Sequence, residues 1–418
     1  MSSMGWIDRL VVILTKFVSW VSTSLGIGAG ETWPGEIAIT LRPNIARTLA
    51  QNLPDGVILI AGTNGKTTTA LMVKTILEHI GKSVVHNATG ANLLNGVVSS
   101  FIKNADWLGR ITADVGIFEI DENSLPIVLR YISPKRIVLL NLFRDQLDRY
   151  GEVDVIVEKW QKVLGDKNLV LNADDPAIAS LGNKQTIYFG LKDPRKYLKE
   201  KEHASDSIFC PKCGNRLSYE GVYYSHIGVW RCDSCDNQRP KPYVSSWPSS
   251  LPGLYNQYNT LAAVAVAKSL EIPDKDIKNA LKDFSPAFGR QEEVNVGSTT
   301  IKLFLSKNPA GFNASLRTVL EMGAKELLFV LNDRIPDGRD VSWIWDVDFE
   351  MIPNDISVTV SGDRVYDIAL RMKYADLKAR VEPDLSKALA HTRGTLFVLA
   401  TYSAMLEIRK HIVGHKIL

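Results

Sequence analysis

Cysteine is scarce in this sequence. Only four cysteines occur among 418 residues, and all of them fall in two Cys-x-x-Cys pairs. A secreted protein stabilised by disulfides would distribute its cysteines along the chain. The clustering instead predicts a metal site in a reducing compartment, so we expect a cytoplasmic protein.

An excess of charge of one sign is also missing. The 49 basic and 46 acidic residues give a formal net charge of +3 at pH 7. A nucleic-acid-binding protein usually concentrates basic residues on one face. We therefore expect no nucleic-acid partner, and the charge balance indicates no other partner either.

Long hydrophobic runs without charge are absent as well. Hydrophobic residues make up 45% of the chain and charged residues 23%, and the mean hydropathy is −0.03. This composition excludes a collagen-like chain, a wholly disordered chain and a polytopic membrane protein. The length predicts two to three globular domains at about 150 residues each.

The most apolar stretch covers residues 6–29, but Asp8, Arg9 and Lys16 interrupt it. A secretory signal would have basic residues before its apolar core, and a spanning helix needs about 20 nearly uncharged residues. Apolar side chains recur at steps of three and four at Trp6, Leu10, Ile13, Phe17 and Trp20. This period predicts an amphipathic helix. It leaves three interpretations open: a helix packed on its own protein, attachment of the apolar stripe to a membrane surface, or a membrane span.

Short β-branched runs alternate with helical stretches from residue 55 onward. This alternation is typical of a doubly wound α/β sheet. Strands are expected at 56–61, 83–86, 115–120, 136–140 and 168–172, with helices at 68–80 and 258–270. A second α/β pattern follows, with strands expected at 300–305, 326–331, 357–361 and 395–400.

These patterns predict three parts of the chain. Residues 1–45 form the amphipathic helix and a lead-in segment, residues 46–295 a central α/β domain, and residues 296–418 a second α/β domain. The cysteine module is expected as an insert at about 206–240. The two domains are expected to join near residues 290–296.

A phosphate-binding loop is predicted at residues 61–68, which read Ala-Gly-Thr-Asn-Gly-Lys-Thr-Thr between a strand and a helix. Glycines allow the backbone to curl so that its N–H groups face a phosphate, and the helix N-terminus adds a positive dipole end. Lys66 would reach the β- and γ-phosphates, and Thr67 would bind Mg²⁺. The nucleotide contacts expected here are Gly62, Thr63, Asn64, Gly65, Lys66, Thr67 and Thr68. The first glycine of the usual Gly-x-x-x-x-Gly-Lys pattern is missing, and we expect residues 62–64 to take its place.

Acidic residues lie at the carboxyl end of the expected strand 115–120, where ligands of open α/β sheets bind. Glu119 is the first candidate Mg²⁺ ligand and Glu122 the second. For Asp121 and Glu122, the alternative is the ordinary preference for acids at a helix N-terminus.

Seven motifs follow one another in the order found in Mur ligases and folylpolyglutamate synthases, which this chain resembles over about residues 45–418. They read GTNGKTT, FEIDE, NLFRDQLDRY, NADDP, LPGLYNQYNTLAA, FGRQEEV and KNPA. The resemblance implies a P-loop Mur ligase central domain and ATP-dependent amide formation through an acyl phosphate. It also implies that Lys66 contacts phosphates and that Thr67 and Glu119 hold Mg²⁺. Asn256 and Asn259 would contact the nucleotide, and Arg290 would lie at the domain junction.

Three departures from the family pattern concern the second metal, a modified lysine and the substrate. Asp145-Gln146 replaces an Asp-His pair, so one histidine metal ligand is absent, and Lys159 lies near the position of a carbamylated lysine. Residue 62 already begins the phosphate loop, which leaves no room for a domain that grips a UDP moiety. A substrate such as a lipid-linked precursor is therefore expected.

The cysteine module pairs Cys210 and Cys213 with Cys232 and Cys235, with eighteen residues between the pairs. This spacing predicts a closed tetrahedral Zn²⁺ site of structural type, and the alternatives are two redox dithiols or an iron site. A Mur-type P-loop domain with such an insert and no UDP domain is similar to the MurT-type subunits of lipid II isoglutaminyl synthase. That resemblance implies amidation of the D-glutamate α-carboxylate, with ammonia from a GatD-like glutaminase subunit in a heterodimer. A glutaminase needs a nucleophilic cysteine, and all four cysteines here are assigned to metal.

Residues 332–350 hold the densest cluster of aromatic and acidic side chains. They predict either a loop followed by a packed helix or a docking surface for the partner. The resemblance implies an aspartate that completes the partner's Cys-His pair. Asp346 is the first candidate, and Asp340 and Asp337 are the alternatives.

Two other functions remain open on sequence grounds. One is a folylpolyglutamate- or cyanophycin-like ligase that adds an amino acid, and the other is a zinc-ribbon ATPase that binds nucleic acid. The leading hypothesis places the protein in the cytoplasm, with the inner face of the plasma membrane as an additional expected site.

Overall fold

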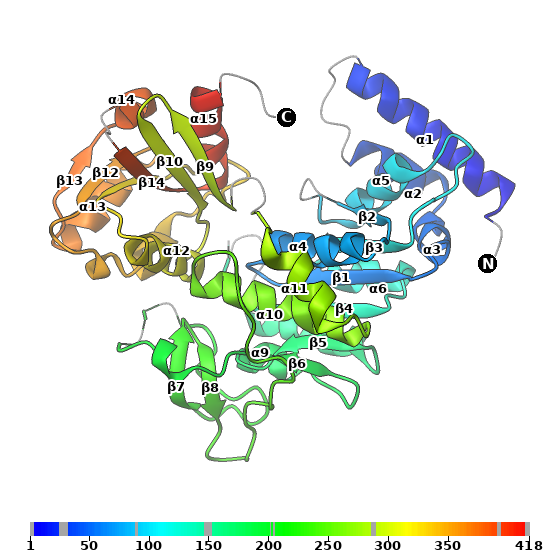
Figure 1. The fold of residues 1–418 in the computed structure, drawn as a ribbon, viewed down its shortest axis with the longest axis horizontal. Helices are drawn as coiled ribbons and strands as arrows, with labels where there is room; N and C mark the ends of the chain where they lie inside the picture. The colour runs from blue at the N-terminus through cyan, green and yellow to red at the C-terminus, as the bar shows by residue number, and fades with distance from the viewer. Residues whose placement is uncertain are drawn as a thin grey trace.

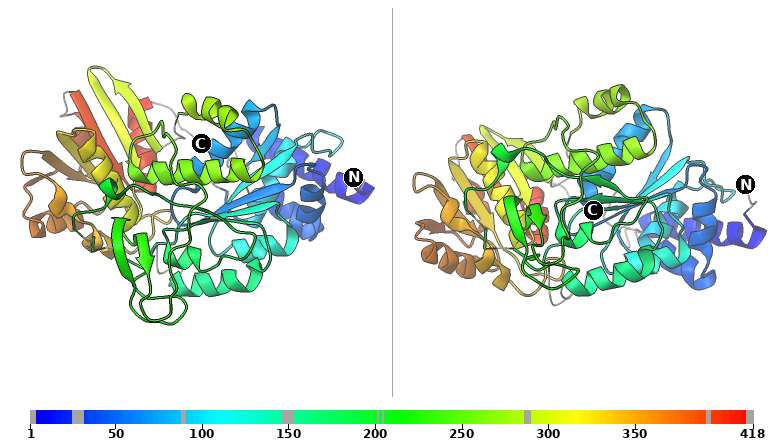
Figure 2. Two further views of the ribbon diagram at one scale, coloured as in Figure 1. Left: turned by 60° about the horizontal axis from the view of Figure 1, so that its bottom comes forward. Right: turned by 90° about the horizontal axis from the view of Figure 1, so that it is seen from below.

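The computed structural model describes residues 4–24, 32–87, 91–145, 153–200, 202–203, 205–285, 290–390 and 394–413. A central α/β domain and a C-terminal α/β domain lie side by side, and a small hairpin projects from the central domain (Figure 1). Helix α1 lies at the end of the molecule opposite the C-terminal domain (Figures 1 and 2).

The central sheet has six parallel strands in the order β2-β3-β1-β4-β5-β6. They span Val57–Ala61 (β1), Val84–His86 (β2), Val115–Ile120 (β3), Arg136–Leu139 (β4), Leu169–Asn172 (β5) and Ile187–Phe189 (β6). The chain extends the sheet first on one side of β1 and then on the other. The carboxyl end of β1 therefore lies at the point of strand-order reversal, where open α/β sheets bind ligands. The doubly wound sheet expected from the sequence is confirmed.

Strand β1 is buried on both faces, which explains its continuous apolar sequence. Leu59 faces one hydrophobic cluster and Ile58 and Ile60 face the other, because successive side chains point to opposite faces. Helices α2, α3, α5, α6, α8 and α9 pack on one face of the sheet, and helices α4, α10 and α11 pack on the other. They span Trp33–Leu41 (α2), Ile45–Gln51 (α3), Lys66–His79 (α4), Leu94–Asn104 (α5), Leu125–Tyr131 (α6), Val153–Leu164 (α8), Pro176–Ala179 (α9), Leu254–Ser269 (α10) and Asp274–Lys282 (α11).

The C-terminal sheet has the order β13-β12-β11-β14-β10-β9, and only its edge strand β9 is antiparallel. Its strands span Arg290–Val296 (β9), Thr299–Leu305 (β10), Glu326–Val330 (β11), Ser357–Ser361 (β12), Ala379–Val381 (β13) and Gly394–Ala400 (β14). Its helices span Pro309–Glu321 (α12), Val365–Tyr374 (α13), Leu385–Ala390 (α14) and Tyr402–Val413 (α15). The sequence assigned residues 290–296 to the connection between domains, but they form a hairpin with β10, because the turn at Gly297 joins two strands in register.

The cysteine segment forms a separate two-stranded antiparallel sheet of β7 (Ser218–Tyr224) and β8 (Ile227–Arg231). Tyr223 and Trp230 are buried beneath it, and the Trp230 indole donates to the Ala173 carbonyl at 3.0 Å. These contacts attach the hairpin to the carboxyl edge of the central sheet.

Helix α1 (Trp6–Ser24) forms as the amphipathic pattern predicts and packs on α2 and α5. It packs through the face opposite the predicted apolar stripe, because Val11, Val12 and Thr15 are buried. Of the stripe, Trp6, Leu10, Phe17 and Trp20 are exposed, and Ile13 is half-buried. Among the described residues, no helix is long and apolar enough to cross a membrane.

Candidate functional site

The phosphate loop connects β1 to α4 through two glycines in the left-handed region. Gly62 has φ of +136°, and Gly65 has φ of +90° and precedes the first residue of α4. A Cβ atom at Gly65 would lie 2.1 Å from Oδ1 of Asn259, so a side chain here would collide with α10. Glycine is therefore required both for the backbone conformation and for this close approach.

Two pairs of side chains meet at the start of α4. The Thr67 hydroxyl donates to Oε2 of Glu119 at 2.8 Å. The Lys66 ammonium lies 3.4 Å from Oε2 of Glu122 and also donates to the Gly62 and Thr63 carbonyls. The structure thus brings the four expected residues together on the carboxyl edges of β1 and β3, where a phosphate and a cation would meet.

Buried polar atoms without partners mark the same place. Oε1 of Glu119 and Nε2 of His86 lie 4.0 Å apart, and both side chains are 3% exposed. Neither atom has a hydrogen-bond partner within the described parts of the chain. A hydroxyl and a carboxylate oxygen are ligands suited to Mg²⁺. Thr67 and Glu119 therefore fit a divalent cation on chemical grounds.

Asn64 joins the loop to both domains. Its backbone N–H donates to Oδ1 of Asn141 at 2.8 Å, and the Asn141 amide donates back to the Asn64 carbonyl. Its side chain forms a reciprocal amide pair with Asn308 at 3.1 and 3.2 Å. Asn308 caps α12, so this pair links the phosphate loop to the C-terminal domain.

A cavity lies between the two domains beside this loop. It is lined by Asn64, Gly65, Thr68, Asn256 and Asn259 of the central domain and by Phe304, Leu305, Ala310, Gly311 and Ala314 of the C-terminal domain. The two asparagines of α10 bond to each other at 3.1 Å. The backbone of Arg290 lies in β9, but its side chain lies outside the described part of the structure.

Asp145 forms an ion pair with Lys307 of the C-terminal domain. Burial raises the pKa of Asp145, although the ammonium of Lys307 opposes that effect. Its second oxygen, Oδ1, has no hydrogen-bond partner among the residues described. Gln146, the expected departure from the family pattern, lies outside the described residues. Lys159 is exposed on α8 and donates to Oδ1 of Asn123 at 3.0 Å.

The four cysteine sulfurs gather within 4.8 Å of one another. The separations are 3.7 Å for Cys210 and Cys235 and 3.5 Å for Cys213 and Cys232. A tetrahedral zinc site with Zn–S bonds of about 2.3 Å has sulfur separations of about 3.8 Å. The backbone N–H of Lys212 also points at the Cys210 sulfur at 3.4 Å, as expected where N–H groups stabilise thiolates. The cluster therefore fits a four-coordinate metal without an open position.

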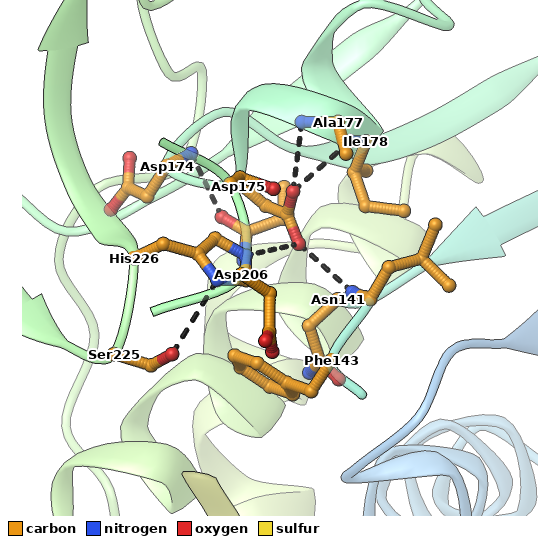
Figure 3. Close-up of polar contacts among 12 residues, drawn as sticks. Asn141, Phe143, Asp174, Asp175, Ala177, Ile178, Asp206, Ser225 and His226 are labelled. Carbon is orange, nitrogen blue, oxygen red and sulfur yellow. Dashed lines mark hydrogen bonds and ion pairs between the residues drawn. The ribbon is translucent and has the colours of Figure 1, made fainter. Parts of the chain in front are cut away.

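A buried pair connects the hairpin to the edge of the sheet (Figure 3). Nε2 of His226, in the β7–β8 turn, lies 3.4 Å from Oδ2 of Asp175, and both side chains are fully buried. The same oxygen accepts the Leu142 N–H at 2.9 Å, while Oδ1 accepts two N–H groups at the start of α9. Asn141, which holds the phosphate loop, immediately precedes Leu142. The hairpin thus supports the segment that positions Asn64.

The three candidate partner-facing aspartates differ in their surroundings. Asp337 is 3% exposed and accepts hydrogen bonds from Ser403, which makes it a buried structural residue. Asp340 accepts the N–H and hydroxyl of Ser342, and these hydrogen bonds lower its pKa. Asp346 is 41% exposed and lies 3.4 Å from the Arg144 guanidinium. Only Asp340 and Asp346 therefore remain available to a partner.

For several residues of the site, the sequence motifs predict no individual role. Asn141, Asp145, Lys307 and Asn308 are the main examples. Each lies in a motif beside a strand end or a helix cap, which was the available signal. Their side-chain contacts cross 77 to 244 residues of chain, so spacing alone does not reveal them.

Comparison with known proteins agrees with this geometry. The Mur ligase middle domain family matches residues 60–267, and the MurT ligase C-terminal family matches residues 305–405. The lipid II isoglutaminyl synthase (glutamine-hydrolysing) subunit MurT of Staphylococcus aureus (strain COL) is 33% identical over 427 residues, which covers 96% of each chain. The subunit of the same name from Streptococcus pneumoniae (strain ATCC BAA-255 / R6) is 32% identical and covers 94% of each chain.

Solved structures show the same fold at lower identity. A pseudomurein peptide ligase type C from Methanothermus fervidus has a TM-score of 0.68 at 23% identity, covering 86% of this chain and 78% of that chain. MurF from Acinetobacter baumannii has a TM-score of 0.63 at 17% identity, covering 91% and 80%. The chain therefore belongs to the Mur ligase family and, within it, to the MurT subunits of lipid II isoglutaminyl synthase.

Proposed function

We propose that this chain is the ligase subunit of a glutamine-hydrolysing lipid II isoglutaminyl synthase. Its reaction would be the ATP-dependent amidation of the D-glutamate α-carboxylate in the stem peptide of lipid II, which gives D-isoglutamine. The observation that carries the proposal is 33% identity across 96% of both chains to a MurT subunit. The grouping of Lys66, Thr67 and Glu119 at one sheet edge supports it.

The chemistry that we propose runs in two steps. The substrate carboxylate attacks the γ-phosphorus of ATP, which breaks the bond to ADP and forms an acyl phosphate. Ammonia then attacks the acyl carbon, phosphate leaves, and the nitrogen loses a proton. Carboxylate is a poor acyl donor at neutral pH, so phosphorylation supplies the leaving group that amide formation needs.

The protein's part in this proposal is to position the reactants and to neutralise charge. The Lys66 ammonium would contact the β- and γ-phosphates, and Asn256 and Asn259 would contact the nucleotide in the cavity between the domains. Thr67 and Glu119 would hold Mg²⁺, which supplies positive charge to the phosphate oxygens when it is bound. Glu122 would remain the partner of Lys66, and the cysteine cluster would hold Zn²⁺ in a structural role.

Ammonia is proposed to come from a separate glutaminase subunit in a heterodimer. All four cysteines of the sequence lie in the metal cluster, so none is available as the nucleophile for glutamine hydrolysis. ATP and reduced cysteines belong to the cytoplasm, and the proposed substrate is lipid-linked. We therefore place the reaction at the inner face of the plasma membrane.

The test is an amidation assay with lipid II in detergent, ATP and ammonium chloride. We expect one ADP and one phosphate for each amide formed, measured by mass spectrometry and phosphate release. Glutamine should replace ammonium only when the glutaminase subunit is added. A product that carries an added amino acid would instead favour the folylpolyglutamate- or cyanophycin-like alternative, and ATP hydrolysis stimulated only by nucleic acid would contradict the proposal.

A further inference from the structure

Helix α1 turns its apolar face away from the protein. The exposed apolar side chains are those of Trp6, Ile7, Leu10, Leu14, Phe17 and Trp20, and each is at least 44% exposed. An ordinary surface helix buries such a stripe against the core. Burial of apolar area is the main favourable contribution to the free energy of folding. In this orientation the exposed side chains of α1 do not make that contribution.

Polar contacts on the opposite face fix this rotation of the helix. Asp8 is 7% exposed and pairs with Arg42 of the neighbouring segment at 2.7 Å. The Lys16 ammonium donates to the Ala105 carbonyl. If α1 turned over to bury its stripe, these ion-pair and hydrogen-bond contacts would be lost. The fold therefore holds the apolar face outward.

The loop after α5 extends the same surface. Trp107 and Leu108 are 57% and 56% exposed, and the Trp107 ring lies 5.4 Å from the Lys16 ammonium. Gly109 approaches the backbone of Arg9, which places this loop directly beside α1. We call the six exposed side chains of α1 together with Trp107 and Leu108 the outer patch.

The charges next to the outer patch are mainly positive. Helix α1 and residues 103–110 contain four cations, Arg9, Lys16, Lys103 and Arg110, against two acids, Asp8 and Asp106. Asp8 is ion-paired, and Asp106 accepts the N–H groups of Leu108 and Arg110. Lys103 and Arg110 are exposed at the border of the patch. An approaching surface with negative charge would therefore be attracted.

We propose that the outer patch adsorbs to the surface of a bilayer that contains anionic lipid. Tryptophan is enriched at the boundary between water and lipid, and three of the eight patch residues are tryptophans. Interfacial helices bury such a face about 5–10 Å deep and gain from basic residues beside it. The proposal rests in part on the proposed function, because a lipid-linked substrate places the reaction at that same surface.

The position of the patch is compatible with catalysis at the membrane. Helix α1 lies at the end of the molecule away from the C-terminal domain (Figures 1 and 2). The cavity between the domains is lined by neither α1 nor the loop after α5. Adsorption through the outer patch would thus leave the nucleotide cavity accessible from the cytoplasm.

The experiment is vesicle flotation of the full chain without ATP or lipid II. Wild-type protein should float with vesicles of phosphatidylcholine and phosphatidylglycerol, and more weakly with phosphatidylcholine alone. Leu10→Ser combined with Phe17→Ser should lower the partition coefficient by about tenfold or more, because two apolar anchors are lost. Trp6→Ser combined with Trp20→Ser is the second variant, in case the first does not fold.

Tyr366→Ser is the matched control, because Tyr366 is 72% exposed on the C-terminal domain and should leave binding unchanged. Unchanged binding of both folded double variants would overturn the proposal. So would a wild-type dimer, or a complex with the glutaminase subunit, that the same substitutions dissociate, since either result would assign the patch to a protein. Wild-type protein that amidates lipid II in detergent but does not bind vesicles would refute this inference and leave the proposed function intact.

Discussion

Lys66 is held in place before any phosphate arrives. Its side chain is 12% exposed, and its ammonium contacts two loop carbonyls and the Glu122 carboxylate. A buried cation needs such partners, because removing it from water is otherwise costly. Phosphate oxygens would replace the carbonyl oxygens as partners of the Lys66 ammonium and would bind it more strongly, because they are charged. The loop can therefore bind an anion with little rearrangement of its backbone.

Replacing Lys66 with alanine should therefore abolish catalysis without unfolding the protein. We expect Lys66→Ala to lower ATP-dependent amide formation by about a hundredfold or more, since it removes the charge that stabilises the transferring phosphate. Lys74→Ala on the exposed side of the same helix, where Lys74 lies 3.5 Å from Glu78, is the matched control. Amidation rates and thermal unfolding of both variants check this, and near-normal turnover by Lys66→Ala would refute the phosphate-loop assignment.

His226 should make stability depend on pH. Burial alone would lower its pKa, but the charges of Asp175, Asp206 and Glu202 outweigh burial and raise it. A raised pKa means that the imidazolium stabilises the fold below the unfolded pKa of about 6.5. That contribution is lost as the pH rises through the higher folded pKa.

We therefore expect His226→Gln to lower the unfolding temperature by several degrees at pH 6. The difference from wild type should shrink steadily as the pH increases above neutrality, when measured by thermal unfolding in a series of buffers. A difference that stays constant or grows with pH would mean that the folded protein holds His226 in its neutral form.

Site residues are predictable from the sequence where they lie close together along the chain. The phosphate loop and the two Cys-x-x-Cys pairs depend on local spacing, and the structure brings the members of each together. Asn308 pairs with Asn64 across 244 residues, and no local pattern specifies that contact. Asp337 could not be distinguished from Asp346 either, because burial is a property of the folded chain.

Elements were predictable where hydrophobic patterning has one interpretation. The buried strands β1, β3 and β5 carry continuous apolar runs and were located within one residue at either end. Strand β9 was not predicted, because its sequence, RQEEVNV, is too polar to indicate a strand. It is a strand because it pairs with β10. The rotation of α1 was also unpredictable, since periodicity identifies an apolar face but not what covers it.

The hairpin β7–β8 should depend on its metal. A two-stranded hairpin is at best marginally stable alone, and four sulfurs at zinc-like separations close it at one end. We expect one Zn²⁺ per chain by elemental analysis of freshly purified, reduced protein. Cys210→Ser should lose the metal and expose the hairpin to limited proteolysis, whereas Ser234→Ala, between Cys232 and Cys235, should change neither. Absence of metal from the wild-type protein would contradict the four-thiolate site.

At the level of the whole molecule, contacts between the domains surround the cavity beside the phosphate loop, and a second set of contacts lies on the adjoining surface. Asn64–Asn308 and Asp145–Lys307 connect the domains beside the phosphate loop. On the neighbouring surface, Arg144 joins Asp346 of the C-terminal domain to Asp206 at the base of the cysteine module. Arg144 directly precedes Asp145, whose ion pair with Lys307 lies beside the phosphate loop. Its other partner, Asp346, is 41% exposed and open to solvent. A glutaminase docked there would release ammonia close to its acceptor.

Asp346→Asn separates the two sources of ammonia. If the Asp346 carboxylate orients a histidine of the glutaminase, the substitution removes the charge that stabilises the imidazolium and permits the wrong tautomer, which costs up to about 10⁴-fold in catalytic triads. Arg144 keeps its ion pair with Asp206, so the ligase site should be unaffected. We expect amidation with glutamine to fail while amidation with free ammonium persists, and Asp355→Asn, 67% exposed on the same domain, should affect neither. Equal loss with both nitrogen donors would place Asp346 in the ligase site or its support, and equal retention would transfer the role to Asp340.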